Sequence, residues 1–187
     1  RGNNPEPEIV LVVNGKGEVM GATLGNDVNL RDVEGRSALL LGKAKDNNAS
    51  CSLGPFIRLF DDTFSIDDVR TAEVELKVEG AEDGFVLNDG SDMSKISRDV
   101  LDLVGQTMSE NHQYPDGLAL FTGTLFAPTR DRDGEGQGFT HKIGDVVSIS
   151  SAMLGTLQNT VTLSNRAAPW EFGLTALMKI LAQRELH

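Results

Sequence analysis

The 187-residue sequence predicts one mainly β domain of the α+β type, with a few peripheral helices. Short apolar runs bounded by hairpin signals outnumber segments with helical periodicity. No Gly-x-Gly-x-x-Gly or phosphate-loop motif follows a predicted strand, which argues against the nucleotide-binding α/β folds. No period of 20 to 50 residues repeats, so the sequence does not favour a solenoid.

In the first half of the chain, alternating or continuous apolar residues predict strands, and Gly-rich turns join them. Strands are expected at residues 9–13, 18–24, 74–79 and 84–87, with a hairpin turn at 14–17. Residues 31–41 favour a short helix and then an extended piece. Residues 50–55 favour a loop before the apolar run 56–60. Ser65 and Asp68 form the pattern of a capping box for one helical turn.

The second half predicts two helices and three further strands. Ser97 is the expected cap of the first helix, whose apolar face is formed by Val100, Leu101, Val104 and Met108. Strands are expected at residues 118–121, 146–149 and 158–163. The apolar stripe of the C-terminal helix consists of Leu174, Leu177, Met178 and Leu181.

Composition limits the classes of function. The net charge of −11 disfavours nucleic acid and anionic membranes as partners. No run is long enough to predict a transmembrane helix. The single Cys51 cannot form an intrachain disulfide, so we expect a reducing cytoplasm and a small buried cysteine. Because the chain opens on Arg1 with charged motifs directly behind it, we expect residues 1–187 to be a catalytic domain whose N-terminal segment is absent.

Two glutamates flank a proline just before the first predicted strand. Pro5 and Pro7 favour extended backbone, so the alternating Glu6 and Glu8 are expected to project side by side. Carboxylates this close repel each other unless a cation lies between them. The pair therefore suggests half of a divalent-metal site, although two solvated residues before a strand would show the same pattern.

Asp27 is the best third carboxylate. It ends the next predicted strand, and a hairpin would return it beside Glu6 and Glu8, although Asp27 could instead be a turn residue. Three hard oxygen ligands favour Mg²⁺, with Mn²⁺ and Ca²⁺ as alternatives, over Zn²⁺. A 2-keto acid suits such a site as substrate, since its carboxylate and keto oxygens chelate as a pair and the metal polarises the carbonyl.

Other residues are candidates for contact with the substrate. Lys43 or Lys45, if near the metal, would have a lowered pKa and could serve as a base or as a clamp for an enolate; both could also be solvated loop lysines. Arg31 could face the same site or pair with Asp32. The turn containing Thr124 could offer hydroxyl and backbone N–H donors to a carboxylate, or be an ordinary turn.

Five segments occur in the order found in the fumarylacetoacetate hydrolase family, and the resemblance covers nearly the whole chain. They are Pro5-Glu6-Pro7-Glu8, Gly25-Asn26-Asp27-Val28-Asn29-Leu30-Arg31-Asp32, Thr122-Gly123-Thr124, Gly144-Asp145-Val146-Val147 and Gly155-Thr156-Leu157-Gln158-Asn159. The resemblance implies that Glu6, Glu8 and Asp27 bind the metal and that Arg31 lies at the active site. It also implies a mixed β-sandwich roll and a homodimer or higher homo-oligomer.

Within that family the sequence is similar to the branch that dehydrates 2-keto-3-deoxy sugar acids, which implies 2,5-dioxopentanoate as the product from a pentonate. Counting back from Gly54-Pro55 places the family lysine at Lys45, whereas anchoring on Leu41-Gly42 places it at Lys43; we prefer Lys45. Glu34 is the first choice for the acid that assists loss of hydroxide, and a residue N-terminal to this chain is the second. The alternatives are a hydrolase or decarboxylase that cleaves a C–C bond of a diketo acid, and a noncatalytic binding domain.

Overall fold

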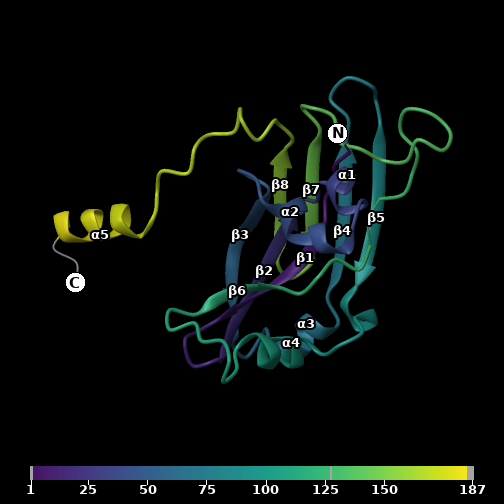
Figure 1. The fold of residues 1–187 in the computed structure, drawn as a ribbon. Coiled ribbons are helices and arrows are strands. Elements are labelled where there is room, and N and C mark those ends of the chain that lie inside the picture. Colours follow the sequence, from purple (N-terminus) through teal and green to yellow (C-terminus); the bar gives the residue numbers. More distant parts are fainter. Residues whose placement is uncertain (1, 127, 185–187) are drawn as a thin grey trace.

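Two four-stranded antiparallel sheets make up most of the protein (Figure 1). The computed structural model describes residues 2–126 and 128–184. The first sheet has the order β3-β2-β1-β6 and the second has the order β5-β4-β7-β8. The strands are β1 (Pro7–Val13), β2 (Val19–Asp27), β3 (Cys51–Leu59), β4 (Glu73–Glu79), β5 (Val86–Asp92), β6 (Leu118–Phe121), β7 (Val146–Ser151) and β8 (Gly155–Thr160).

The helices are short and lie outside the sheets, so the predicted mainly β class is confirmed (Figure 1). They are α1 (Arg31–Glu34), η1 (Ala38–Leu40), α2 (Leu41–Lys45), α3 (Ile66–Arg70), η2 (Met93–Lys95), α4 (Val100–Thr107) and α5 (Leu174–Gln183). The predicted capping box is present at the start of α3, where Ser65 and Asp68 bond reciprocally.

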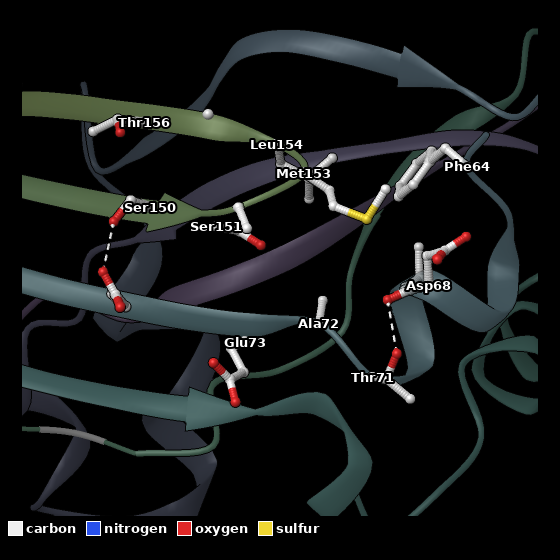
Figure 2. A pocket seen from close by; sticks show the side chains of 14 residues that line it. Phe64, Asp68, Thr71, Ala72, Glu73, Ser150, Ser151, Met153, Leu154 and Thr156 are labelled. Carbon is white, nitrogen blue, oxygen red and sulfur yellow. Dashed lines mark hydrogen bonds between the residues drawn. The ribbon is translucent and has the colours of Figure 1, made fainter.

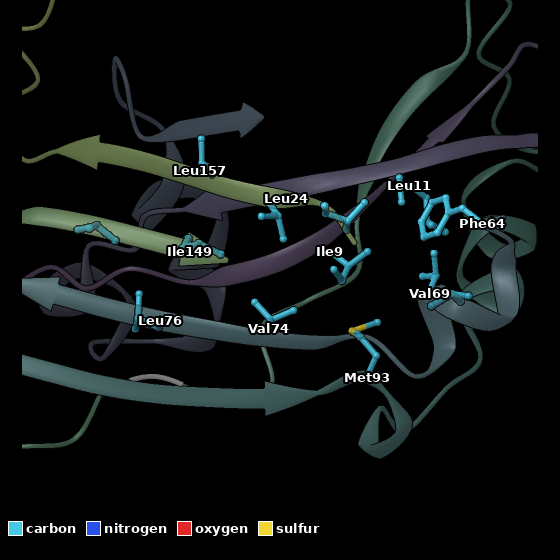
Figure 3. Packing of buried hydrophobic residues seen from close by; sticks show 14 of the residues in the cluster. Ile9, Leu11, Leu24, Phe64, Val69, Val74, Leu76, Met93, Ile149 and Leu157 are labelled. Carbon is cyan, nitrogen blue, oxygen red and sulfur yellow. The ribbon is translucent and has the colours of Figure 1, made fainter. Parts of the chain in front are cut away.

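Apolar side chains from the two sheets meet face to face and form one core (Figure 3). Ile9 and Leu11 of β1 and Leu24 of β2 are fully buried against the second sheet, which contributes Leu76 and Ile149. β1 is buried over almost its whole length and lies between β2 and β6. Its continuous apolar run fits this burial, since side chains on both faces are largely removed from water.

The predicted loop at residues 50–55 is wrong, because β3 begins at Cys51. Gly54 and Pro55 are turn signals, yet β2 supplies hydrogen-bonding partners through pairs such as Gly25 with Leu53. β3 is an edge strand of its sheet, and a proline is tolerated there because one side of the strand needs no ladder partner.

Two helix predictions also need correction. The extended piece expected within residues 31–41 is absent, and α1, η1 and α2 form consecutive helical turns that carry both Lys43 and Lys45. Helix α4 is capped by Asp99 rather than Ser97, since the Asp99 side chain accepts a hydrogen bond from the Leu101 N–H at 2.9 Å. A carboxylate also complements the positive end of the helix dipole.

The segment before Glu6 is held on two sides. Asn4 forms an isolated bridge with Asn29, just beyond the end of β2. Asn3 donates from its backbone N–H to Thr140 Oγ1 (3.2 Å), and its carbonyl accepts from the His141 N–H (3.1 Å). These bonds fix the direction in which the chain enters β1, and so they position the residues that start it. Arg1 lies outside the described residues.

The C-terminal helix is present as predicted, but it extends away from the sheets (Figure 1). None of its residues is buried, and Leu174 and Met178 of the predicted apolar stripe are 71% and 61% exposed. Within the described residues no helix has both the length and the apolar character needed to cross a membrane.

Candidate metal centre

Antiparallel pairing of β1 with β2 brings three carboxylates together. Glu8 pairs with Gly25, and beyond the ladder the Asp27 N–H donates to the Glu6 carbonyl at 3.1 Å. Glu6 and Glu8 lie two residues apart on extended backbone, so they project to the same side. One carboxylate oxygen of each of Glu6, Glu8 and Asp27 lies within 4.8 Å of the others, and among the described residues these three form the only such group of potential metal ligands.

Glu8 is the most buried of the three, with 4% of its surface exposed. Burial raises the pKa of its carboxyl group to about 7, and the negative charges of Asp27 and Glu6 add to this effect. A hydrogen bond from the Gly123 N–H (2.7 Å) acts in the opposite direction. A carboxylate that is shielded from water beside two others needs nearby positive charge to stay ionised. Hard oxygen donors of this kind fit Mg²⁺.

Lys45 supplies positive charge at this place in the structure. Its Nζ lies 2.6 Å from Glu6 Oε2, 2.8 Å from Asp27 Oδ2 and 2.7 Å from the Asp27 carbonyl oxygen. Burial alone would lower the lysine pKa, but the hydrogen bonds to Asp27 and Glu6 outweigh it and raise the pKa above its usual value. The sequence predicts a lysine pKa lowered by a nearby cation, whereas here the carboxylates raise it.

Helix α2 explains why Lys45 reaches the carboxylates and Lys43 does not. Ala44 is fully buried, and its carbonyl accepts from the Leu30 N–H at 3.0 Å. The Ser50 hydroxyl donates to the Lys45 carbonyl oxygen at 2.7 Å and so fixes the end of the helix. Lys43 points to the exposed side of this helix, where its ammonium lies 3.9 Å from Asp46.

The other predicted site residues form bonds that do not reach the three carboxylates. Arg31 Nη1 donates to the Pro128 carbonyl at 3.3 Å. Glu34 accepts a hydrogen bond from the Asn29 side-chain amide. The Thr124 hydroxyl donates to the Phe126 carbonyl at 2.7 Å. Their contact with a substrate therefore stays a prediction.

One contact to the carboxylates comes from a backbone N–H in the turn that the sequence predicts to bind a substrate carboxylate. Gly123 has a φ of +92°, a conformation that favours glycine, and its N–H points at Glu8. The preceding Thr122 ties this turn to β1 by donating from its hydroxyl to the Ile9 carbonyl at 2.8 Å. The sequence marks this turn as a donor site for a substrate, but here its N–H stabilises a carboxylate of the protein.

Cys51 is exposed rather than buried as predicted. It is the residue of β3 that pairs with Asp27, so it lies at the edge of the first sheet next to the candidate metal centre. Cys51 begins β3, and every side chain of this strand is exposed or half-buried.

A separate cavity of about 520 Å³ lies between α3 and the β7–β8 hairpin (Figure 2). Its lining combines the apolar Phe64 and Leu154 with the polar Asp68, Glu73 and Ser151. None of Glu6, Glu8 and Asp27 lines it, and its own carboxylates do not converge into a group that could hold a metal. The group of candidate metal ligands therefore lies at the start of β1 and the end of β2 and not in this cavity.

The model of the fumarylacetoacetate (FAA) hydrolase C-terminal family matches residues 6–162. A protein of Haloferax volcanii described as a probable 2-keto-3-deoxyxylonate dehydratase is 33% identical over 159 residues, which are 84% of this chain and 50% of that protein. The 2-dehydro-3-deoxy-D-arabinonate dehydratase of Saccharolobus solfataricus is 30% identical over 154 residues, which are 82% of this chain and 47% of that enzyme. The chain thus spans about half the length of these curated relatives.

A solved structure shares the fold. It is a 2-keto-3-deoxy-D-arabinonate dehydratase complexed with magnesium and 2,5-dioxopentanoate, with a TM-score of 0.73 and 28% sequence identity. The match covers 87% of this chain and 53% of that one. The likeness supports the mixed β-sandwich architecture that the sequence predicts.

Replacement of Glu8 by Gln should change how stability depends on pH. The folded-state pKa of Glu8 is raised from 4.5 to about 7, so its contribution to stability is fully present below pH 4.5 and is lost as the pH rises through 7. Between pH 5 and pH 8 in metal-free buffer, the wild type should lose unfolding free energy relative to Glu8→Gln, on the order of 2 kcal/mol. Urea denaturation measures this difference.

The exposed Glu82 provides the control. Glu82→Gln should follow the wild type at every pH, because this carboxylate meets solvent in both states. Parallel pH curves for the wild type and Glu8→Gln would contradict the assignment of a buried, electrostatically unfavourable carboxylate at position 8.

Proposed function

The chain belongs to the FAA hydrolase C-terminal family, and from this premise we propose that it is the catalytic part of a metal-dependent hydro-lyase. Its substrate would be a 2-keto-3-deoxy pentonate and its product 2,5-dioxopentanoate. The observation that carries the proposal is the convergence of three carboxylates and one lysine at the start of β1 and the end of β2. The names of the two dehydratase relatives and the ligands of the similar solved structure support the choice of reaction.

Glu6, Glu8 and Asp27 would hold the divalent ion, with Mg²⁺ as the first choice and Mn²⁺ or Ca²⁺ as alternatives. Three carboxylates offer the hard oxygen donors that these ions require, and the burial of Glu8 favours a bound cation over solvation. When bound, the ion supplies Lewis acidity to the carboxylate and 2-keto oxygens of the substrate, which acidifies the protons on C3.

Lys45 is the proposed base. Its ammonium owes its raised pKa to Glu6 and Asp27, so a cation shared by those carboxylates would weaken both ion pairs and lower the lysine pKa. The neutral amine can then take a proton from C3 or, once protonated, stabilise the enolate. Loss of hydroxide from C4 leaves a double bond between C3 and C4. Tautomerisation of this product gives the aldehyde at C5.

Four further roles are part of the proposal, and the sequence resemblance supports those of Arg31 and Thr124. Glu34 would donate the proton to the departing hydroxide, and its half-buried position beside Asn29 is compatible with such a group. Arg31, Lys43 and Thr124 would contact the substrate carboxylate or hydroxyls.

A role in pentose catabolism and a cytoplasmic location complete the proposal, and the single cysteine supports a reducing compartment.

A product assay on the full-length protein with Mg²⁺ tests the function and the lysine together. Incubation with 2-keto-3-deoxypentonate should give a product lighter by one water, and Lys45→Ala should lower kcat by at least ~10²-fold because the base is lost. Lys43→Ala should raise KM and leave kcat within roughly threefold, because Lys43 is proposed only to bind.

Other outcomes of the same assay reject the proposal. Gain of water with C–C cleavage of a 2,4-diketo acid would identify the hydrolase alternative, and loss of carbon dioxide would identify a decarboxylase. No turnover of either substrate would favour the binding domain. Near-normal turnover by Lys45→Ala would reject Lys45 as the base.

We also propose that the chain forms a homodimer or higher homo-oligomer. The edge strand β3 exposes Phe56, Ile57 and Leu59 by 50% or more, and α5 exposes its apolar stripe. An uncovered apolar edge strand is a hazard in a monomer, and a second copy would cover it. The segment 163–184 is also basic, with Arg166, Lys179 and Arg184 against Glu171, while the whole chain is acidic. This charge contrast favours contact between copies.

Sedimentation analysis of the 187-residue chain should therefore show a dimer or larger species at micromolar concentration. Leu59→Asp should shift the equilibrium towards the monomer, while Lys77→Asp on the second sheet should not. A wild type that stays monomeric at ~100 μM would self-associate more weakly than proteins with specific interfaces of standard size do. That result would reject this part of the proposal.

A further inference from the structure

One side chain of the second sheet connects to the candidate metal centre through hydrogen bonds. Asn159 lies in β8 opposite Val147, and its Oδ1 accepts a hydrogen bond from Asn26 Nδ2 of the first sheet at 3.3 Å. The same oxygen accepts a second hydrogen bond, from Ser52 Oγ of β3, at 2.9 Å. Asn159 lies in β8, at an edge of the second sheet, and it contacts β2 and β3 of the first sheet.

Asn26 transmits this contact to the carboxylates. It is 2% exposed and immediately precedes Asp27. Its Oδ1 accepts from the Glu6 N–H at 3.2 Å, while its Nδ2 donates to Asn159. A buried amide satisfied at both ends has a single favourable orientation, since rotation would place donors against donors and acceptors against acceptors.

We propose that Asn159 is a positioning residue of the metal centre. Its carbonyl oxygen orients the Asn26 amide, and that amide fixes the backbone at Glu6 relative to Asp27. The distance between two of the three carboxylates thus depends on a residue that itself binds no metal. This inference deepens the proposed function and rests on it, because it presumes that the carboxylates bind a cation.

The contacts also define which property of Asn159 matters. Both hydrogen bonds end on its side-chain oxygen, so only an acceptor is required at this position. Aspartate retains that acceptor and nearly the same shape, whereas leucine retains only the size. Gln158 offers a matched control in the same strand, because it is exposed and donates to Ser148 Oγ at 3.1 Å instead of contacting the first sheet.

Mn²⁺ binding to the 187-residue chain, measured by electron paramagnetic resonance of the free ion, tests the inference. Asn159→Leu should weaken Mn²⁺ binding by roughly 10-fold or more, the size of effect typical of groups that orient metal ligands. Gln158→Leu should bind Mn²⁺ with an affinity within roughly threefold of the wild type. Asn159→Asp should do the same or bind more tightly, because it adds a carboxylate. Equal losses in Asn159→Leu and Asn159→Asp, or none in Asn159→Leu, would overturn the positioning role.

Amide hydrogen exchange without metal provides a second readout. The Glu6 N–H should be protected in the wild type and Asn159→Asp, and it should exchange faster in Asn159→Leu, with unchanged protection of Ile149 as evidence of an intact fold. Unchanged Glu6 protection in Asn159→Leu would overturn the inference. A wild type that fails to bind Mn²⁺ would reject the metal centre itself, and normal wild-type binding with unaffected Asn159→Leu would reject only the role of Asn159.

Discussion

Repulsion among Glu6, Glu8 and Asp27 is the constraint around which this end of the protein is organised. The register of β1 and β2 places the three carboxylates within 4.8 Å of one another, and burial of Glu8 removes much of the water that would screen them. Such an arrangement needs positive charge to persist. In this structure Lys45 provides it, and under the proposed function a divalent ion would share that task.

The rest of the fold holds these charges in place from several directions. The core between the two sheets fixes β1 at the centre of its sheet, and the turn at Gly123 brings an N–H to Glu8. Helix α2 brings Lys45 from one side, while Asn26 and Asn159 link the Glu6 backbone to the second sheet. Each support is a short-range contact, but together they come from widely separated segments of the chain. The supports of the site therefore include contacts from both sheets.

Much of this architecture follows from local sequence patterns. The apolar run of β1 and the two alternating glutamates predict both a buried strand and a pair of carboxylates on one side of it. The prediction from sequence fails where tertiary contacts override local signals. Gly54 and Pro55 suggest a loop, yet this segment pairs with β2 as an edge strand. Nor does a sequence reveal contacts of the backbone, so the Gly123 N–H could not be assigned to Glu8. The count back from Gly54-Pro55 favours Lys45, and the helical turn of α2, which local pattern does not predict, brings Lys45 rather than Lys43 to the carboxylates.

Under the proposed function, a divalent ion and Lys45 compete for the carboxylates of Glu6 and Asp27. A crystal structure of the chain soaked with Mn²⁺, with the ion located by anomalous scattering, tests it most directly. We expect one peak bound by Glu6, Glu8 and Asp27, with the Lys45 ammonium withdrawn from at least one of the two carboxylates that it now contacts. A peak elsewhere, or no peak with both Lys45 ion pairs unchanged, would contradict it.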